Sequence, residues 1–402
     1  MLLPERVTLL GRWRLGTSMA RVGLYKSLEK YIEPRATHYR DVPTSPATFT
    51  AEWLTEVMCR DVPNASVEAF ELGRGSSGAT DRQALTLRYN DAGIKAGLPS
   101  AVFCKYSNSV QQRLWLGNSG LMQHEVAFYR EMRAEMNIET PQSYHVAYHP
   151  RGWQSAVILE DLDATKGATF CAPSTPMTKE MICDLLGELA IFHGHYWNDP
   201  RLDKQFTWLP TPLQLFTRFC ETFSFHDQVF VGLQRAGHMV PDALKGRNER
   251  LWKAYGQSCA QSDHHPPRTL LHGDPHVGNT YITAAGKMGL NDWQVCMKGN
   301  WAWDFAYLLL TALPIEDRRN WERDLLTYYV ERLKEHGGQP GSFDELWLDY
   351  RRHTLHALMG WLVTIGAGGV QPKQMQVDQV SLAVIERAAV AMVDLESIEA
   401  LA

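Results

Sequence analysis

The segment after residue 66 alternates between apolar and polar positions. Leu85, Leu87 and Tyr89 are separated by single polar residues. This period of two is typical of a β-strand with one buried face. Four more strands are predicted from short apolar runs, at 67–72, 101–105, 144–148 and 155–160. We expect these strands to form one small antiparallel sheet.

Helical spacing of apolar residues dominates the chain beyond residue 163. Ile182, Leu185 and Leu189 lie at intervals of three and four residues, which is the pattern of an amphipathic helix. Thr178 is suited to cap the amino end of this helix. One earlier helix is predicted at 120–136, inside the sheet-rich segment. Further helices are predicted at 211–236, 241–262, 316–336, 343–365 and 376–397.

The change from strand spacing to helix spacing divides the chain into lobes. We predict an N-terminal helical extension at 1–50, a sheet-rich N-lobe at 51–160 and a helical C-lobe at 161–402. The short segment Glu160-Asp161-Leu162 would connect the two lobes. This arrangement is an α+β fold, in which helices are segregated from an antiparallel sheet.

The N-terminal extension mixes apolar and basic residues at 6–31. Leu9, Trp13 and Tyr25 are interspersed with basic residues such as Arg12. A basic amphipathic segment of this kind is typical of a helix at a membrane surface, or else of a helix that packs along the fold. We favour packing on the fold, because membrane-surface helices usually separate their apolar and polar faces more cleanly.

The composition is that of an ordinary folded protein with a sizeable core. The 402 residues are 45% hydrophobic and 21% charged, which excludes a disordered or collagen-like chain. Lysine and arginine number 40 against 45 aspartate and glutamate residues, so the net charge is −5. This balance gives no support for nucleic acid as a partner.

The cysteines and the apolar stretches indicate in which cellular compartment the protein is expected. Seven scattered cysteines without a CxxC pair argue against a disulfide framework or a thiolate zinc site. Pro4, Glu5 and Arg6 stand where a secretion signal would have its apolar core. The uncharged stretch 353–372 contains two histidines and several glycines, so we interpret it as a buried helix and not as a membrane span. We therefore predict a cytoplasmic protein without a transmembrane segment.

The motif that indicates chemistry is His272-Gly273-Asp274-Pro275-His276, followed by Asn279 and by Asp292. An aspartate, an asparagine five residues later and a second aspartate thirteen residues beyond are the groups that phosphoryl transfer requires. Asp274 would accept the proton of an acceptor hydroxyl, while Asn279 and Asp292 would bind Mg²⁺ through oxygen atoms. For His272-Gly273-Asp274 alone, a turn with a buried, hydrogen-bonded aspartate would be the favoured interpretation. The spacing of Asn279 and Asp292 argues against it.

These two segments resemble the catalytic and metal-binding loops of the aminoglycoside and choline kinase-like phosphotransferases. Gln294, next to the aromatic residue after Asp292, is most similar to the ecdysteroid kinase-like (CHK kinase-like) branch. The resemblance covers about residues 66–313. It implies a bilobal protein-kinase-like fold that uses ATP and Mg²⁺. In this family an aspartate at the position of Asp304 braces the catalytic loop, so Asp304 is expected to have a structural role.

The resemblance also implies a lysine on the third strand, paired with a glutamate on the next helix, that positions the nucleotide phosphates. Lys105 and Glu125 occupy the corresponding positions. A lone lysine on a strand is usually solvated. Lys105, however, follows an apolar run, and burying it would be costly without a partner such as Glu125.

Two further segments are candidates for nucleotide binding. The glycine-rich stretch 73–80 permits close approach of the backbone to phosphates, although alone it would fit a hairpin turn. The stretch departs from the GxGxxG form of protein kinases. The sequence therefore leaves open which of its backbone amides would contact the phosphates. The connector resembles the family segment whose backbone hydrogen-bonds adenine, with the Glu160 and Asp161 side chains solvated. The predicted nucleotide-binding residues are Gly75, Ser76, Ser77, Gly78, Lys105, Glu160 and Leu162.

Together these observations predict an ATP- and Mg²⁺-dependent kinase of a small-molecule hydroxyl. A protein substrate is disfavoured, because 301–310 follows Asp292 without an activation segment. Aromatic residues with few acids between the connector and the catalytic loop favour a lipophilic alcohol: Trp208, Phe216, Phe219, Phe223, Phe225 and Phe230. The alternatives are an aminoglycoside- or choline-type phosphotransferase, or a catalytically idle nucleotide-binding scaffold. The presence of Lys105, Asp274, Asn279 and Asp292 argues against the scaffold.

Overall fold

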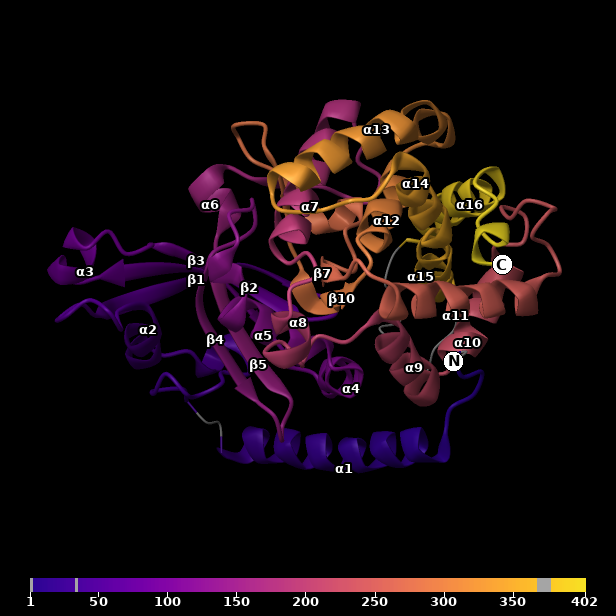
Figure 1. The fold of residues 1–402 in the computed structure, drawn as a ribbon. Coiled ribbons are helices and arrows are strands. Elements are labelled where there is room, and N and C mark those ends of the chain that lie inside the picture. Colours follow the sequence, from indigo (N-terminus) through magenta and orange to yellow (C-terminus); the bar gives the residue numbers. More distant parts are fainter. Residues whose placement is uncertain (1–2, 33–34, 367–376) are drawn as a thin grey trace.

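The N-lobe is a five-stranded antiparallel sheet. The computed structural model describes residues 3–32, 35–366 and 377–402. The strands follow the order β1-β2-β3-β5-β4, and every neighbouring pair is antiparallel (Figure 1). Their bounds are β1 Val67–Ser77, β2 Asp81–Tyr89, β3 Ala101–Tyr106, β4 Ser143–His149 and β5 Gln154–Glu160. The predicted antiparallel sheet is therefore confirmed.

The alternation along β2 has the predicted cause. Leu85, Leu87 and Tyr89 are buried, whereas the residues between them are exposed. Their side chains belong to a small core that also contains Trp53 of α2 (Ala51–Met58). The short helix α3 (Asp91–Lys95) follows β2.

Two helices follow β3, although the sequence pattern predicts only one. The predicted helix at 120–136 is α5 (Leu121–Glu131), and α4 (Val110–Ser119) precedes it. Gly120 separates them with a φ of +89°, a conformation that favours glycine. Gly117 obscures the helical pattern of α4, yet no larger residue fits there, because a Cβ atom would lie 2.1 Å from the Trp153 ring.

The C-lobe is mostly helical, as predicted. Most of its short strands lie between residues 269 and 299. Its helices are α6 Leu162–Lys166, α7 Lys179–His195, α8 Arg201–Lys204, α9 Pro212–Phe223, α10 Phe225–Arg235, α11 Asn248–His264, α12 Ala302–Ala312, α13 Ile315–Glu335, α14 Phe343–Arg352, α15 Leu355–Ile365 and α16 Asp378–Asp394. Its strands are β6 Thr169–Phe170, β7 Thr269–Leu271, β8 Thr280–Ile282, β9 Met288–Leu290 and β10 Met297–Gly299.

Several predicted helix boundaries in the C-lobe were wrong. The helix expected at 211–236 is interrupted at Ser224, which has a φ of 55° and separates α9 from α10. The segment 343–365 contains two helices, α14 and α15, and the helix expected from 241 begins at Asn248. Apolar spacing continues through such breaks because consecutive helices face the same core, so the sequence pattern does not reveal them. Residue 376 and part of the stretch 353–372 lie outside the described residues.

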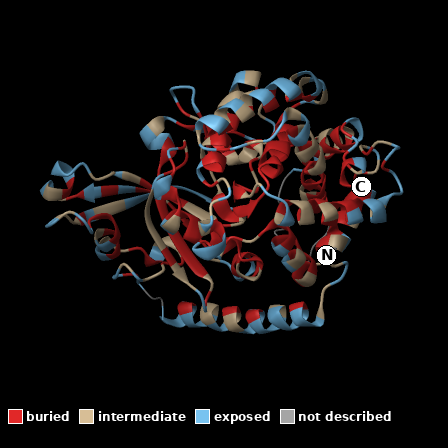
Figure 2. Ribbon diagram, in the orientation of Figure 1, coloured by how far each residue is buried: buried red, intermediate tan, exposed pale blue. Residues whose placement is uncertain are grey.

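The C-lobe core contains the aromatic residues that the sequence analysis placed in an acceptor pocket. Phe216 packs against Tyr255 and Trp303, with ring centroids 5.5 Å and 6.0 Å apart. Phe219 and Phe223 pack against Trp115 of α4. Figure 2 shows buried residues throughout this lobe. These phenylalanines are core residues, so their presence alone does not indicate an acceptor pocket.

The helix α1 (Leu9–Ile32) packs along the outside of the fold, as expected. It lies beside α4 of the N-lobe and α9 of the C-lobe (Figure 1). Glu29 of α1 forms an ion pair with the fully buried Arg113, with Oε1 and Nη1 2.5 Å apart. Within the described residues, no helix combines the length and the apolar content that crossing a bilayer requires.

Candidate active site

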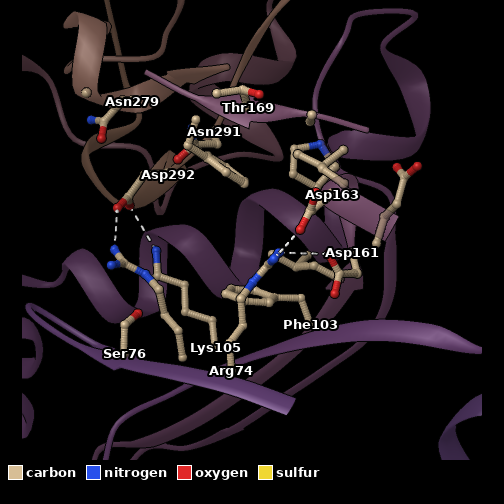
Figure 3. Close-up of a pocket in the computed structure, with 18 of the residues that line it drawn as sticks. Arg74, Ser76, Phe103, Lys105, Asp161, Asp163, Thr169, Asn279, Asn291 and Asp292 are labelled. Atoms are coloured by element: carbon tan, nitrogen blue, oxygen red, sulfur yellow. Dashed lines mark hydrogen bonds and ion pairs between the residues drawn. The ribbon is translucent and has the colours of Figure 1, made fainter. Parts of the chain in front are cut away.

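A cavity of about 500 Å³ lies between the sheet and the C-lobe. Strands β1, β2 and β3 supply residues to one wall, and the segments flanking β8 and β9 supply the opposite wall (Figure 3). Its volume is typical of a site for a small molecule or cofactor. The charged residues of its lining are Arg74, Arg82, Lys105, Glu125, Glu160, Asp161, Asp163 and Asp292.

Lys105 on β3 and Glu125 on α5 form the predicted ion pair. The Nζ atom of Lys105 lies 2.6 Å from Glu125 Oε1 and 2.9 Å from Asp292 Oδ1. Only 6% of either the Lys105 or the Glu125 side chain is exposed. A lysine in this position is not solvated, and its charge requires both carboxylates because an unpaired buried ion is strongly destabilising.

Sequence reasoning missed Arg82 in this cluster, and it named Gln294 without giving it a contact. Arg82 Nη2 lies 3.6 Å from Asp292 Oδ2, and Gln294 Nε2 donates a hydrogen bond of 3.2 Å to Glu125 Oε2. Arg82 is the cross-strand partner of Lys105 in the β2–β3 register, and side chains at paired positions lie on the same face of a sheet. The register of the two strands is the signal that would have found it.

Asp292 has an unusual backbone conformation and a stabilised charge. Its φ of 65° and ψ of 71° lie in the left-handed region, which is uncommon for non-glycine residues. Burial opposes ionisation of its carboxyl group, but the charges of Lys105 and Arg82 outweigh burial and lower its pKa. The pKa of Glu125 is raised, mainly by burial, although Lys105 opposes this shift.

Asp304 at the start of α12 holds the loop that contains Asp274. Its carboxylate accepts hydrogen bonds from the backbone amides of His272, at 2.6 Å, and Gly273, at 2.9 Å. The imidazole of His193 on α7 contacts the same carboxylate at 3.2 Å. Gly273 has a φ of +83°, and a Cβ atom there would lie 2.2 Å from the Val295 carbonyl oxygen. The loop therefore requires glycine at this position.

The Asp274 carboxylate is surrounded by amide, hydroxyl and imidazole groups. Asn279 Nδ2 donates to Asp274 Oδ2 at 3.1 Å, and Tyr307 lies near the same carboxylate. His276 Nε2 lies 3.7 Å from Oδ2. Burial raises the pKa of Asp274, while His276 and Tyr307 only partly oppose this shift. Sequence reasoning missed Tyr307, because it lies on α12 and no local pattern links it to Asp274.

The arrangement of two aspartates, an asparagine and a paired lysine agrees with a comparison of the chain with protein families. The family described as the phosphotransferase enzyme family matches residues 117–340, more than half of the chain. The chain belongs to this family. It is accordingly a phosphotransferase whose acceptor is a hydroxyl group. A comparison with curated protein sequences finds no match.

Several solved structures are similar to this phosphotransferase. A macrolide 2'-phosphotransferase from Brachybacterium faecium has 14% identity and a TM-score of 0.42, over 85% of this chain and 97% of the other. An ethanolamine kinase from Plasmodium vivax has 11% identity and a TM-score of 0.49, over 92% and 94%. A choline kinase from Streptococcus pneumoniae has 14% identity and a TM-score of 0.46, over 82% and 94%.

The glycine-rich segment of the phosphotransferase is more regular than a loop. Residues 73–77 belong to β1, and after an irregularity between Leu72 and Gly75 the residues 75–77 pair with β2. Gly75 and Ser76 line the cavity, as predicted, but Ser77 and Gly78 are outside its lining. The Ser77 hydroxyl donates to Asp81, and the Gly78 amide donates to the Thr80 carbonyl. Pairing of the strands thus leaves only a short turn and removes both residues from the cavity.

The connector residues Glu160 and Leu162 also line the cavity. The Glu160 and Asp161 side chains are buried, so the expectation that they are solvated was wrong. The Glu160 carboxylate accepts a hydrogen bond from Thr165 at 2.8 Å, and that of Asp161 forms an ion pair with Arg74. The Glu160 amide already donates to the Gln142 carbonyl at 2.9 Å. The Glu160 amide is therefore not free to bind a ligand, and a ligand would form hydrogen bonds with other backbone groups of the connector.

The remaining cavity surface is apolar where the connector and the sheet meet. Phe103, Leu159, Leu162, Ala168 and Phe170 line this part, and Phe103 lies close to Arg74 and Asp161 in Figure 3. A flat aromatic group would replace water here without loss of hydrogen bonds. The sequence analysis recognised Leu162 but not the others, because their segments meet only in the folded chain.

Two residues of the cavity are suited to hold Mg²⁺. Asp292 is ionised, and the Asn279 amide nitrogen donates to Asp274, which leaves its oxygen as a ligand. Among the described residues, no group of three histidine, cysteine, aspartate or glutamate side chains is placed to bind a metal. The carboxylate oxygens of Asp292 and the amide oxygen of Asn279 are ligands of the kind that Mg²⁺ combines with phosphate oxygens and water.

Proposed function

We propose that this phosphotransferase transfers the terminal phosphoryl group of ATP to the hydroxyl group of a small molecule. The supporting observation is that Lys105, Asn279 and Asp292 line one cavity, with Asp274 hydrogen-bonded to Asn279. This combination places phosphate-binding, metal-binding and proton-accepting groups together. A nucleotide-binding scaffold without activity would have no need of Asp274.

In this proposal different residues of the cavity bind the phosphates, the metal ion and the adenine ring. The Lys105 ammonium binds phosphate oxygens, and Glu125 keeps the ammonium in place through the 2.6 Å contact. Asn279 and Asp292 would hold Mg²⁺, which when bound neutralises part of the phosphate charge. The apolar surface at the connector would receive the adenine ring. The first amide of α6, at Leu162, has no acceptor within its own helix, so it could donate a hydrogen bond to that ring.

Asp274 is the proposed general base. It accepts the proton of the acceptor hydroxyl as the oxygen of that hydroxyl attacks phosphorus, and the leaving group is ADP. The hydrogen bond from Asn279 holds the carboxylate, and Asp304 holds the loop that contains it. A pKa above the ordinary aspartate value makes Asp274 a better proton acceptor.

The proposed acceptor is a lipophilic alcohol. The phenylalanines of α9 and α10 are buried in the C-lobe core, and so are Trp361 and Tyr307 near Asp274, so none of them offers an exposed aromatic surface to the acceptor. The choice is supported by the resemblance of Asp292, Trp293 and Gln294 to the ecdysteroid kinase-like branch.

Two features favour a small acceptor and a cytoplasmic protein. After Asp292 the chain enters β10, which pairs with β7, and α12 begins at Ala302. This leaves no extended segment on which a protein substrate would lie.

All seven cysteines are free thiols, which agrees with a reducing compartment.

The test is an ATP-consumption assay with Mg²⁺ against sterols and other bulky alcohols, aminoglycosides, choline and ethanolamine. We expect turnover with a lipophilic alcohol, and none in Asp274→Asn. The exposed Asp242 forms only a surface ion pair with Lys245, so Asp242→Asn serves as the matched control and should retain activity. Turnover restricted to the cationic acceptors would replace the lipophilic proposal with the aminoglycoside or choline alternative. Nucleotide binding without turnover of any acceptor would favour the scaffold.

A further inference from the structure

The helix α1 packs on the fold with its small residues and leaves its large apolar residues outside. Gly11, Ser18, Val22 and Glu29 are its buried residues. The contact at Gly11 is so close that a Cβ atom would lie 1.9 Å from the Glu221 carbonyl oxygen. The inward face of α1 is therefore fully used by the contact with α4 and α9.

The opposite face of α1 is an exposed apolar stripe. Leu9, Trp13, Leu24 and Tyr31 are 85%, 66%, 60% and 86% exposed. At 100° per residue these four positions fall within about 60° of one another, so they form one stripe along the helix. Figure 2 shows exposed residues along the outer side of this helix. We call this surface the outer stripe of α1.

Basic residues flank the outer stripe on both sides. Arg12 and Lys30 lie on one side of it, and Arg14 and Arg21 lie on the other. Glu29 is the only acidic residue between Leu9 and Ile32, and it is buried. Five basic residues and one acidic residue give α1 a charge of +4, although the whole chain has −5.

Three arginines form an unpaired cluster next to the outer stripe. Arg14 and Arg21 of α1 and Arg218 of α9 line a cavity of about 440 Å³. Within the described part of the chain, none of the three forms an ion pair with a carboxylate, and Arg218 Nη1 donates to the Ser119 carbonyl oxygen at 3.1 Å. Partial desolvation and the charge of Arg14 lower the pKa of Arg218, and Glu221 only partly opposes this. Clustered guanidinium groups of this kind are suited to a phosphate.

Arg21 gives independent support for an anionic ligand. Its Nε atom is buried and has no hydrogen-bond partner. Its guanidinium carbon lies 4.4 Å from the centre of the Trp153 ring. A buried donor without a partner is costly, and a phosphate oxygen in the cavity would satisfy it.

We propose that α1 docks this phosphotransferase on an anionic lipid bilayer, with the outer stripe inserted at the interface and the cavity of Arg14, Arg21 and Arg218 holding a lipid phosphate. A helix with an apolar stripe between basic residues lies in the plane of a membrane surface. Anionic headgroups attract such basic residues. The packing predicted from the sequence and membrane docking are compatible because they use opposite faces of one helix.

Flotation with lipid vesicles tests this proposal. The full-length protein should float with vesicles of phosphatidylcholine and phosphatidylserine, and should not float with phosphatidylcholine alone. The double variant Trp13→Ser/Leu24→Ser removes the outer stripe, and Arg14→Ala/Arg21→Ala removes part of the phosphate cavity. Each should reduce bound protein roughly tenfold or more. High salt should weaken binding of the wild type.

Matched controls keep the flotation result interpretable. Ile94 is 66% exposed on α3, so Ile94→Ser removes an exposed apolar group far from α1 and should bind vesicles like the wild type. The proposal is overturned if wild-type protein fails to float with anionic vesicles, or floats equally well with neutral ones. A concentration-dependent dimer that Trp13→Ser/Leu24→Ser abolishes, without vesicle binding, would assign the stripe to a second copy. Thermal stabilisation by soluble glycerol phosphate without vesicle binding would assign the cavity to a free phosphate ester.

Discussion

The surroundings of Asp292 and of Asp274 differ in the charge that each carboxylate meets. Asp292 lies between Lys105 and Arg82, and these cations lower its pKa. Asp274 meets the amide of Asn279 and the hydroxyl of Tyr307, and burial raises its pKa. Two carboxylates whose pKa values are moved in opposite directions are suited to different tasks. The ionised one suits a metal ion, and the more basic one suits a proton.

The two regions also differ in how the fold holds them. Lys105 and Arg82 reach Asp292 from paired strands of the N-lobe sheet, across the cavity. The Asp274 loop is held by backbone hydrogen bonds to Asp304 within the C-lobe. A movement of the lobes relative to each other would therefore change the surroundings of Asp292 more than those of Asp274.

Replacing the two carboxylates separately should have the largest effects and should distinguish their roles. Asp274→Asn should lower kcat by about 10²–10⁴ and leave the affinity for Mg-ATP within about twofold, because the carboxylate acts on the acceptor. Kinetics and calorimetry measure both quantities. Near wild-type turnover in Asp274→Asn would disprove its role as the base.

Asp292→Asn should weaken binding of Mg-ATP by roughly tenfold or more, because the variant loses the charged ligand. Binding of ATP without Mg²⁺ should not weaken, since a negative charge near the phosphates is removed. Calorimetry with and without Mg²⁺ gives the comparison. Equal loss of affinity in both conditions would mean that Asp292 is needed for the shape of the cavity and not for the cation.

Lys105→Met and Glu125→Gln should act through one ion pair. Each should raise the KM for ATP or lower kcat, with the larger defect in Lys105→Met. The double variant should differ from the sum of the single effects by about 0.5–3 kcal/mol. Additive effects would show that the 2.6 Å contact does not contribute to catalysis.

The pH dependence should report Asp274 and not Asp292. A general base must be deprotonated, so kcat/KM should fall as the pH decreases through the raised pKa of Asp274. Asp292 has a lowered pKa and stays ionised over this range. The acidic limb should therefore lie above the ordinary aspartate value of about 3.9. A limb at or below that value would contradict the assignment.

Stability should show the smallest difference between the two aspartates, with opposite signs. The folded-state pKa of Asp274 is raised, so its ionisation destabilises the fold once the pH exceeds the unfolded value. Asp274→Asn should raise the melting temperature at neutral pH by a few degrees at most. This gain should shrink as the pH falls.

The pKa of Asp292 is lowered in the folded state, so its charge stabilises the fold above the unfolded pKa, and this stability is lost as the pH falls. Asp292→Asn should therefore lower the melting temperature at neutral pH. Thermal denaturation of both variants across pH tests the pair, and a shift of the same sign in both would contradict the comparison.

The sequence by itself determined the lobes and the central residues of the site. Alternation at Leu85, Leu87 and Tyr89 reports a half-buried strand because burial of one face requires it. The spacing of Asp274, Asn279 and Asp292 indicates phosphoryl transfer because these groups lie within a short segment of chain. Lys105 and Glu125 were found through resemblance to a family, and their contact confirms the pair.

Only the tertiary structure decided which groups meet from distant segments. Arg82 reaches Asp292, and Tyr307 reaches Asp274, through strand register and helix packing that no local pattern encodes. The same is true of the aromatic residues of α9, because a buried core and a binding pocket require the same apolar side chains. The direction that α1 faces was likewise decided by packing, since a helix with small residues on one side and large apolar residues on the other can pack on the fold through either face.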